Sequence, residues 1–363
     1  MAHRRHLPLA GIRVVDFTTL LPGPLAGLML AEAGATVDKI ERPGGEEMRG
    51  YRPEIAGQSA FYTALNAGKT VHFLDLKSPE GKAEALDLVA SADVLIEQFR
   101  PGVMERIGLG AETLMKVNPG LVYCAISGFG QTGPLSARAG HDLNYIGETG
   151  LLNIAPGSPS VPPALIADIG GGTFPAVINI LLALIRRHKT GEGAVIDIAM
   201  TDAMFTFAWW AYAEGVATGR WSGPNEGQLA NGSPRYALYS AADGALIAVA
   251  ALEQKFWDTF CDMIGLSPDL RDDSPDPGAT RAEVARLIAQ KAAADWEPLL
   301  ETADCCVSVV RSLADAVRHP HFRERGLFSG EILLADGETI PALPVPLSPE
   351  FRVTGQRKAP RET

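Results

Sequence analysis

Residues 70–99 have the sequence TVHFLDLKSPEGKAEALDLVASADVLIEQF, and this stretch decides the fold class. It opens and closes with short apolar runs, residues 70–76 and 93–99, which are typical of buried strands. Between them, Ser78-Pro79 suits the start of a helix, because a serine side chain accepts from free N–H groups and proline fits the first turn. The order strand, helix, strand predicts two parallel strands joined by a crossover helix.

The same alternation extends on both sides of this unit, from residue 12 to residue 129. A long apolar helix ending in a basic cluster is expected after Gly170-Gly171-Gly172, because positive charge suits a helix C-terminus. The chain therefore predicts an α/β fold with a mostly parallel sheet. The expected strands of this sheet are residues 12–17, 36–41, 70–76, 93–99, 121–129 and 194–199.

A second domain is expected after residues 219–234, GRWSGPNEGQLANGSP, because this Gly-, Pro- and Asn-rich composition is typical of a linker or a functional loop. Beyond it, residues 236–240 and 245–250 flank Asp243-Gly244, which predicts a β-hairpin, and several helices follow. We expect a large domain over residues 1–218, a small α+β domain over 219–318, and a segment over 319–363 that returns to the large domain. The tail from Gly355 is expected to be mobile.

Composition excludes several classes of protein. The chain has 363 residues, 46% of them hydrophobic, and a formal net charge of −11, which disfavours nucleic-acid binding because that needs a basic face. The longest mostly apolar run, residues 176–185, is about half of the roughly 20 residues that cross a bilayer, so no membrane span is expected. The start, MAHRRHLPLAG, lacks the apolar core of a secretion signal, and the four cysteines form no C-x-x-C pair. We expect a cytoplasmic protein with reduced thiols.

The first candidate site is the loop SGFGQTGP (127–134), followed by RAGHDLNY (138–145). It comes after a predicted strand, and ligands of α/β folds bind at the carboxyl ends of strands. Main-chain N–H groups there, around Gly140 to Asp142, could hold an anion or an enolate oxygen. The alternative is a glycine-rich turn in which His141 caps a helix.

Two acidic residues each follow an apolar stretch. Asp168 comes after Ala-Leu-Ile-Ala and before three glycines, a setting that can raise the pKa of a carboxyl group or expose it as a nucleophile. The alternative is that Asp168 is the N-cap of the following helix. Glu253 follows residues 246–252, LIAVAAL, and in isolation suits the first turn of the next helix.

Together, in this order and spacing, the motifs resemble those of the 2-methylacyl-CoA racemases, a branch of the family III CoA-transferases. The resemblance covers nearly all of the chain and is specific as a set, although any single motif is weak. The matching segments are GIRVVDF with LPGP, KIERPGG, FLDLKSPEGK, ADVLIEQFRPGVMERIGLG, GFGQTGP, AGHDLNYI, ADIGGG, TGEGAVIDIAM and AVAALEQKFW.

The resemblance implies a proton-transfer site. The family's two acid–base residues fall on His141 and Asp168, and the glutamate that supports the histidine falls on Glu253. The implied fold is an interlocked homodimer of subunits with a large Rossmann-like and a small domain, with the active site where these meet across subunits. The implied substrate is an acyl-CoA of fatty acid or lipid metabolism, and neither a metal nor a redox cofactor is expected.

The resemblance also implies the contacts to CoA, whose phosphates an acidic protein must hold with locally gathered cations. Arg42, Lys77, Arg100 and Arg106 follow predicted strand ends, where phosphates are expected in this architecture. The full implied set is Arg42, Leu74, Asp75, Leu76, Lys77, Gln98, Phe99, Arg100, Arg106, Gly140, Asp142, Asn144 and Tyr145.

Two other functions stay open. In a CoA-transferase, Asp168 would attack the donor thioester and carry an acyl group, and the segment GQSAFYTALNAGKTVHFLDLK is as similar to transferases as to racemases. His141 and Glu253 favour the racemase, because the transferases generally lack that histidine. A silent acyl-CoA-binding scaffold is disfavoured, since it needs no opposed acid–base groups. For the acyl group, a core role is favoured over an apolar trough for Met29, Leu143, Phe205, Phe207, Trp209 and Trp210.

Overall fold

The computed structural model describes residues 7–154 and 160–363, so the basic start MAHRRH lies outside the described residues. The chain divides into two compact units. The first consists of Met1–Thr149, Pro162–Phe207 and Pro320–Thr363, and the second of Gly150–Val161 and Ala208–His319. The chain therefore changes unit at 149/150, 161/162, 207/208 and 319/320, where the sequence suggested changes only at 218/219 and 318/319.

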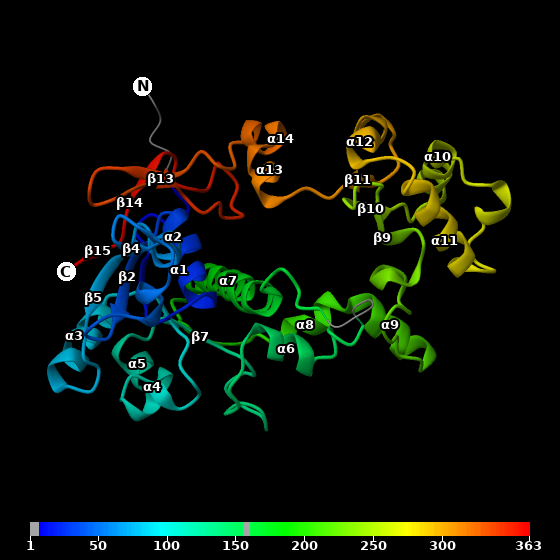
Figure 1. Cartoon of the computed structure of the whole chain (residues 1–363). Coiled ribbons are helices and arrows are strands. Elements are labelled where there is room, and N and C mark those ends of the chain that lie inside the picture. The colour runs from blue at the N-terminus through cyan, green and yellow to red at the C-terminus, as the bar shows by residue number, and fades with distance from the viewer. Residues whose placement is uncertain (1–6, 155–159) are drawn as a thin grey trace. The chain divides into compact units, whose positions relative to one another are not determined.

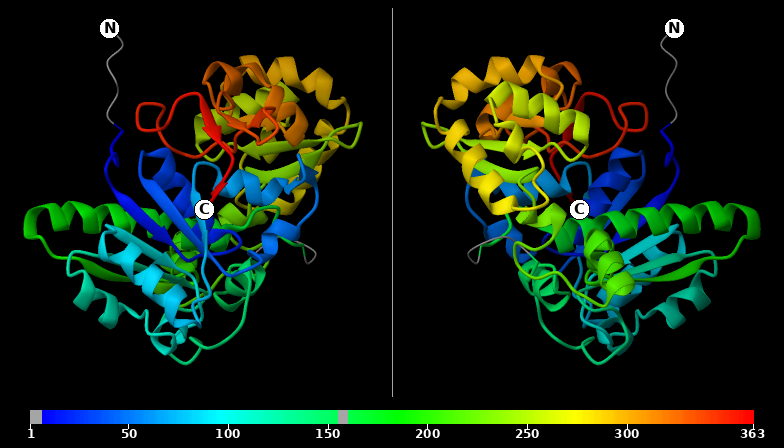
Figure 2. Two further views of the ribbon diagram at one scale, coloured as in Figure 1. Left: turned by 90° about the vertical axis from the view of Figure 1, so that its left-hand side faces the viewer. Right: turned by 90° about the vertical axis from the view of Figure 1, so that its right-hand side faces the viewer.

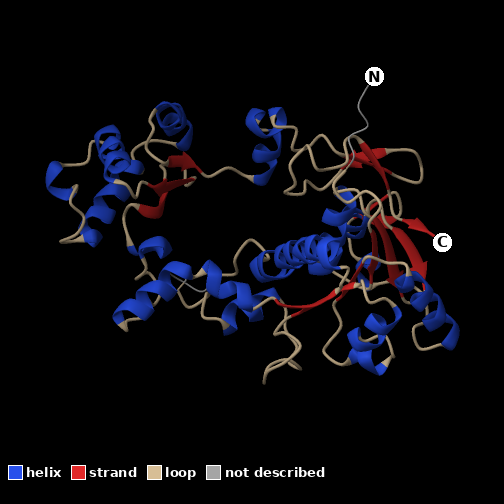
Figure 3. Ribbon diagram, turned by 180° about the vertical axis from the view of Figure 1, so that it is seen from behind, coloured by secondary structure: helices blue, strands red, loops and turns tan. Residues whose placement is uncertain are grey.

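A seven-stranded sheet forms the centre of the first unit, and every pair of neighbouring strands in it is parallel (Figure 3). Its order is β15-β5-β2-β1-β6-β7-β8. The strands are β1 (Arg13–Asp16), β2 (Thr36–Glu41), β5 (Thr70–Phe73), β6 (Val94–Glu97), β7 (Val122–Ser127), β8 (Ala194–Ala199) and β15 (Arg361–Glu362). The α/β class and the parallel sheet are confirmed.

Helices pack on the sheet and bury apolar side chains against it. On one face, Val15, Leu95 and Tyr123 of three adjacent strands share a core with Val89 of α3 and Leu114 of α5. The long helix α7 and the helix α1 contact each other, α7 packs on β7 and β8, and α1 packs on β1 (Figure 2). The helices are α1 (Pro22–Glu32), α2 (Ala60–Asn66), α3 (Pro79–Ala90), α4 (Val103–Arg106), α5 (Ala111–Val117), α6 (Asp142–Glu148), the π-helix η2 (Ile166–Thr173), α7 (Phe174–Thr190), α8 (Asp202–Phe207) and α14 (Pro320–Glu324).

The expected helix signals act where the sequence placed them. The Ser78 hydroxyl accepts the N–H of Gly81 at 3.0 Å, and Pro79 opens α3. The long helix α7 ends with basic residues in its last turn, followed by Gly191 in the left-handed conformation with φ of 78°. Capping and end charge therefore set both boundaries locally.

The end of the chain is ordered by pairing, so the expectation of a mobile tail from Gly355 is wrong. β14 (Gln356–Lys358) pairs in parallel with β12 (Glu331–Leu333), which also pairs with β13 (Thr339–Pro341). Two residues later, β15 completes the edge of the main sheet beside β5 (Figure 1). The main-chain hydrogen bonds of these ladders hold a sequence that has no strand-like apolar pattern of its own.

The second unit has its own core and its own small antiparallel sheet, β11-β10-β9. The expected hairpin is confirmed, with Ala237, Tyr239, Ile247 and Val249 buried beneath Trp257 and its neighbours. The elements are α9 (Trp209–Thr218), η3 (Gln228–Gly232), β9 (Tyr236–Ser240), β10 (Leu246–Ala250), α10 (Gln254–Ile264), η4 (Pro268–Leu270), α11 (Pro277–Ile288), α12 (Ala293–Thr302), β11 (Val307–Val309) and α13 (Leu313–Arg318).

The core role favoured for six apolar residues holds for Met29 and fails for several others. Met29 is buried in α1, whereas Leu143 is 43% exposed, Phe205 53% and Trp209 64%, and Phe207 is also exposed. Large apolar side chains left this open on one chain are typical of surfaces that a ligand or a partner covers. The sequence shows that these residues are apolar, but it does not show which surface covers them.

One helical stretch of the described residues, Ile166–Thr190, is long and apolar enough to cross a membrane by length and composition alone. Core helices of soluble proteins meet the same criterion, so a single such helix is weak support for a span. The expectation that the protein has no membrane span stays a prediction.

Candidate active site

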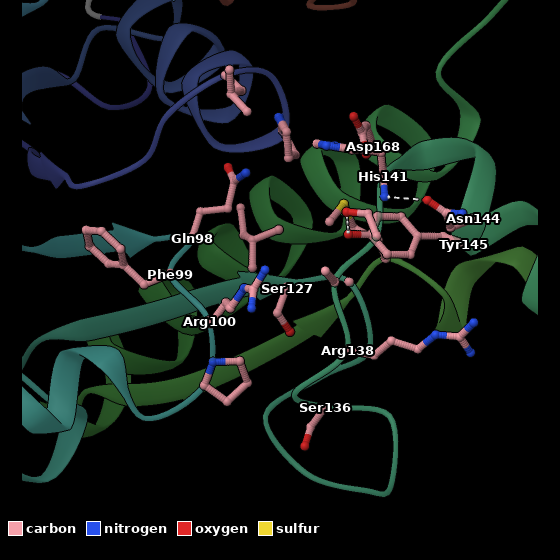
Figure 4. Close-up of a pocket in the computed structure, with 18 of the residues that line it drawn as sticks. Gln98, Phe99, Arg100, Ser127, Ser136, Arg138, His141, Asn144, Tyr145 and Asp168 are labelled. Carbon is pink, nitrogen blue, oxygen red and sulfur yellow. Dashed lines mark hydrogen bonds between the residues drawn. The ribbon is translucent and has the colours of Figure 1, made fainter. Parts of the chain in front are cut away.

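A cavity of about 510 Å³ lies at the carboxyl ends of the central strands in the first unit (Figure 4). Thr19 and Leu20 follow β1, Gln98 to Pro101 follow β6, and Ser127 ends β7. Parallel strands end at the same edge of a sheet, so the loops after them converge there. We call this space the first cavity; His141 and Asp168 both line it, so the structure brings together two of the three expected catalytic residues.

His141 stands at the start of α6 as its N-cap residue. Its main-chain N–H donates to Oδ1 of Asn144 at 3.0 Å, and the residue is exposed toward the cavity. The cap position is therefore confirmed, and it is compatible with a chemical role for the imidazole. Of the N–H groups proposed to hold an anion, that of His141 is already occupied by Asn144.

Asp168 lies inside the π-helix η2, whose N-cap is Leu165, so the N-cap interpretation of Asp168 is wrong. The N–H groups of Ala167 and Asp168 both donate to Oδ1 of the buried Asp142, at 2.7 and 3.0 Å. A carboxylate in the first turn of α6 thus holds the turn that carries Asp168. This one side-chain oxygen of α6 therefore joins that helix to the main chain of η2.

The surroundings of Asp168 disfavour its charged form. Burial raises the pKa of Asp168 to about 6, the negative charge of Asp142 adds to this rise, and His141 opposes it. A carboxyl group with this pKa exchanges protons near neutral pH, close to the ordinary pKa of an imidazole, about 6.5. Figure 4 shows the side chains of His141 and Asp168 side by side at one end of the cavity.

The three glycines after Asp168 have a packing cause. A Cβ on Gly171 would clash with the main-chain carbonyl oxygen of Met200, and one on Gly170 would clash with the ring of Phe207. The backbone of η2 therefore comes closer to the β8–α8 segment than any other residue type permits. The close approach fixes the position of Asp168 relative to Met200, which also lines the cavity.

Tyr145 forms part of the wall of the first cavity and packs against the residues that follow β7. Its hydroxyl donates to the carbonyl oxygen of Gly140 at 2.5 Å, and its ring packs edge-on against Phe129 with centroids 5.3 Å apart. Burial raises the pKa of Tyr145 to about 12, the charge of Asp168 adds to the rise, and Arg100 opposes it. Tyr145 is therefore neutral at physiological pH and acts as a hydrogen-bond donor.

A second cavity, of about 680 Å³, lies at the same edge of the sheet. Its lining contains three cations, four acidic residues and several apolar residues: Arg42, Lys77 and Arg100; Glu41, Glu46, Glu47 and Asp75; and Leu74, Leu76 and their neighbours. Arg42 is held by its own turn, because its Nε donates to the carbonyl oxygen of Gly45 at 2.9 Å. The two cavities have four lining residues in common: Thr19, Leu20, Phe99 and Arg100.

Most of the expected CoA contacts line one of these cavities. Gln98, Phe99, Arg100, Gly140, Asn144 and Tyr145 line the first, and Arg42, Leu74, Asp75, Leu76, Lys77, Phe99 and Arg100 line the second. Asp142 lies beneath the first as a positioning group. Arg106 is exposed on α4 and is not a lining residue of either cavity, although Val103 and Ile107 beside it line the second.

Glu253 belongs to the second unit and lines neither cavity. It is exposed and is the N-cap residue of α10, without a side-chain capping bond, so the expectation that it lies in the first turn of that helix is wrong by one position. Its proposed support of His141 stays a prediction.

Sequence reasoning missed several lining residues, among them Thr19, Leu20, Ser136 and Met200. Thr19 and Leu20 follow β1 directly, so the strand-end rule that selected Arg42 and Arg100 could have found them. Arg138 is ion-paired with Glu148 at 2.6 Å, which no local pattern indicates. Within residues 7–154 and 160–363, no group of three or more His, Cys, Asp or Glu is placed to hold a metal ion.

Comparison with known proteins gives matches over almost the entire chain. The family described as "CoA-transferase family III" matches residues 9–362. An alpha-methylacyl-CoA racemase of Mus musculus is 36% identical over 350 residues, covering 93% of this chain and 86% of the relative. An acetyl-CoA:oxalate CoA-transferase of Acetobacter aceti is 33% identical, covering 94% and 89%. The crystal structure of a CaiB/BaiF family protein from Brucella suis is similar with a TM-score of 0.79 and 30% identity, covering 94% and 92%.

Proposed function

Because the chain belongs to CoA-transferase family III, we propose that it is a racemase or epimerase of 2-methylacyl-CoA thioesters. One observation carries this proposal: His141 and Asp168 line the same cavity, and the pKa of Asp168 is raised to about 6. Inversion of an acidic carbon centre requires two acid–base groups, one for each face of the carbon.

The proposed reaction is a proton transfer at the carbon next to the thioester carbonyl. One of the two side chains, in its basic form, removes the α-proton, and the electron pair moves into the carbonyl to give an enolate. The other side chain, already protonated, returns a proton to the opposite face, and the enolate electrons form the new C–H bond. After one turnover, the side chain that acted as base carries the proton and the other side chain has lost one. In the reverse direction the two side chains exchange roles.

We assign the rest of the ester to the two cavities. In this proposal the thioester lies in the first cavity and the phosphorylated nucleotide of CoA in the second, where Arg42, Lys77 and Arg100 supply positive charge to an acidic protein. The N–H of Asp142, at the start of α6, is a proposed donor to the enolate oxygen. The other CoA contact implied by the resemblance, Arg106, would act from the rim formed by α4.

The resemblance carries further parts of the proposal. In an interlocked homodimer, Glu253 of one subunit would accept a hydrogen bond from His141 of the other and fix its tautomer. Both proton transfers use side chains, so the scheme needs neither a metal nor a redox cofactor. We place the enzyme in the cytoplasm, in the metabolism of fatty acids or other lipids. Sedimentation equilibrium tests the dimer, and a monomer at micromolar concentration would contradict it.

The alternative function is a CoA transfer between two carboxylic acids. It is supported by the matches to transferases at similar identity, such as that of Acetobacter aceti. In that reaction the carboxylate of Asp168 attacks the thioester carbonyl, CoA leaves as its thiolate, and an acyl–aspartyl anhydride remains. The carboxylate of the acceptor acid then attacks the aspartyl carbonyl of this anhydride and releases the donor acid. The CoA thiolate finally attacks the acceptor's carbonyl, which gives the acceptor's CoA ester and frees the carboxylate of Asp168.

One experiment separates the two functions. A single epimer of a 2-methylacyl-CoA is incubated with the protein in D₂O, without an acceptor acid, and deuterium at the α-carbon and the epimer ratio are followed by NMR. The racemase predicts deuterium entry together with drift toward an equal mixture. No exchange over several 2-methylacyl esters, with hydroxylamine trapping an acyl group on Asp168, would establish the transferase.

A further inference from the structure

The two cavities share a wall of four residues, Thr19, Leu20, Phe99 and Arg100, which we call the shared wall. It is made from two loop corners, one after β1 and one after β6, and these strands are neighbours in the sheet. A ligand that occupies both cavities must pass along this wall. The positions of the two corners therefore decide how far the parts of that ligand lie from each other.

The corner after β1 is held by buried charged groups from β2 and the loop after it. The N–H of Leu20 donates to Oε2 of Glu46 at 3.1 Å, and Nζ of Lys39 donates to the carbonyl oxygen of Thr18 at 2.6 Å. Lys39 and Glu46 are 3.6 Å apart, with side chains 0% and 1% exposed. Leu20 has a φ of 62°, which a residue with a side chain adopts only when its surroundings impose it.

The corner after β6 is held in the same way by Glu97. Its Oε2 accepts the N–H of Phe99 at 2.7 Å, and Glu97 is 4% exposed. Burial raises the pKa of Glu97 to about 7, and the charges of Glu105 and Asp197 act in the same direction. A further bond links the corner after β6 to α1, the helix that follows the other corner, because Oε1 of Gln98 accepts the N–H of Gly23 at 3.1 Å.

We propose that Glu97 and Glu46 are positioning residues that fix the two corners of the shared wall and thereby set the span between the nucleotide and the thioester of one bound CoA ester. This rests on the proposed function. Glu97 lines neither cavity and Glu46 lines only the second, so neither takes part in the proton transfer in the first cavity. Each acts through a main-chain N–H of a residue that does line it.

The proposal predicts a substrate-dependent defect. Binding of the nucleotide assists the reaction only if the shared wall holds the thioester at the correct distance from Asp168. Misplacement of the thioester by about 1 Å lowers the rate roughly 100-fold. A truncated thioester of N-acetylcysteamine is not anchored in the second cavity. The rate of exchange of this truncated ester should therefore depend little on the position of the shared wall.

The test uses Glu97→Leu and the matched control Glu97→Gln, in the full chain. The amide oxygen of Gln still accepts from Phe99, whereas Leu leaves that N–H without a partner. We expect Glu97→Leu to lower kcat for α-deuterium exchange of the CoA ester at least about tenfold, and to affect the N-acetylcysteamine ester much less. Glu97→Gln is expected to behave as wild type with both esters.

Equal losses with the two esters would show a general structural defect and overturn the proposal, as would an equal defect in Glu97→Gln. Circular dichroism and a thermal melt establish folding. If Glu97→Leu does not fold, Glu97→Asp replaces it, because a carboxylate shorter by one methylene cannot hold Phe99 in the same place; the same ester-dependent loss is expected.

Binding separates failure of the proposal from failure of the proposed function. If wild-type protein exchanges neither ester, the racemase is wrong, and calorimetry then compares CoA with adenosine 3′,5′-bisphosphate. The positioning role predicts that Glu97→Leu weakens binding of CoA and leaves that of the bisphosphate unchanged. Unchanged binding of CoA, or equal weakening of both, would overturn it.

Discussion

Oδ1 of Asp142 accepts the main-chain N–H of Asp168 at 3.0 Å, and so joins the helix that begins after His141 to the π-helix that carries Asp168. The same oxygen accepts the N–H of Ala167 at 2.7 Å. Asp142 therefore has two effects on its neighbour. It fixes the position of Asp168, and its negative charge contributes to the raised pKa of the Asp168 carboxyl.

The first prediction separates these two effects with Asp142→Asn. An amide oxygen still accepts the two N–H groups, but the charge is lost, so the pKa of Asp168 falls below about 6. In the direction in which ionised Asp168 removes the proton, the rate rises with pH as Asp168 ionises. The low-pH limb of the pH–rate profile therefore moves to lower pH in the variant. The measurement is the pH dependence of α-deuterium exchange in the direction that uses Asp168 as base.

Glu148→Gln is the matched control, because it removes one negative charge from the same helix and Glu148 is exposed and bonded to Arg138 instead. It should leave the acid limb in place. An unshifted limb in Asp142→Asn would mean that another group produces it.

The second prediction concerns His141→Ala. Loss of one of two proton-transfer groups lowers exchange by at least about 100-fold, since general acid–base catalysis contributes roughly 10²–10⁴-fold. CoA binding, measured by calorimetry, should stay close to wild type, because the cations proposed to hold the nucleotide line the second cavity. Exchange at the wild-type rate would remove His141 from the mechanism.

Much of the fold follows from local patterns. β2 and β8 have the boundaries predicted from their β-branched runs, and α3 begins at the predicted Ser78-Pro79. Both strands contain Val and Ile and end at turn residues, so their limits are visible in the sequence even though β2 also carries Asp38, Lys39 and Glu41. The edge strand β15 has the sequence Arg361-Glu362 and no such pattern; only its pairing with β5 makes it a strand.

The residues of the site likewise fall into those that local sequence predicts and those that depend on distant segments. His141, Asp168 and Arg100 follow strands or apolar runs, and the strand-end rule brings them to one place. The roles of Asp142 and of Gly171 depend on segments 26 and 29 positions away, so no window of sequence contains both partners. The cap interpretation of Asp168 failed for this reason: three glycines suit a loose turn as well as a tightly packed π-helix.

The third prediction is that Arg100→Ala weakens binding of a CoA ester by about 1.5–3 kcal/mol, the range of a hydrogen bond to a charged group. Arg100 lines both cavities, so its guanidinium can contact the ester wherever it crosses the shared wall. Lys116→Ala removes the same charge from an exposed pair with Glu112 and should change binding by less than about 0.5 kcal/mol. Calorimetry with both variants compares them, and equal affinities would place Arg100 in solvent.

The last prediction tests the close packing of the turn that carries Asp168. In Gly171→Ala, the added methyl group meets the carbonyl oxygen of Met200, which belongs to the main chain and cannot rotate away. Overpacking of this kind costs about 1–3 kcal/mol of folding free energy, and relief requires η2 to move with Asp168. We expect a lower urea midpoint together with slower α-deuterium exchange.

Gly50→Ala is the control for this substitution. Gly50 ends a short helical turn, a Cβ there meets nothing within 4 Å, and its φ is outside the left-handed region. Its urea midpoint and exchange rate should equal those of wild type. If Gly171→Ala unfolds at the same midpoint and exchanges at the same rate as Gly50→Ala, the approach of η2 to Met200 does not hold Asp168, and Asp142 alone would account for its position.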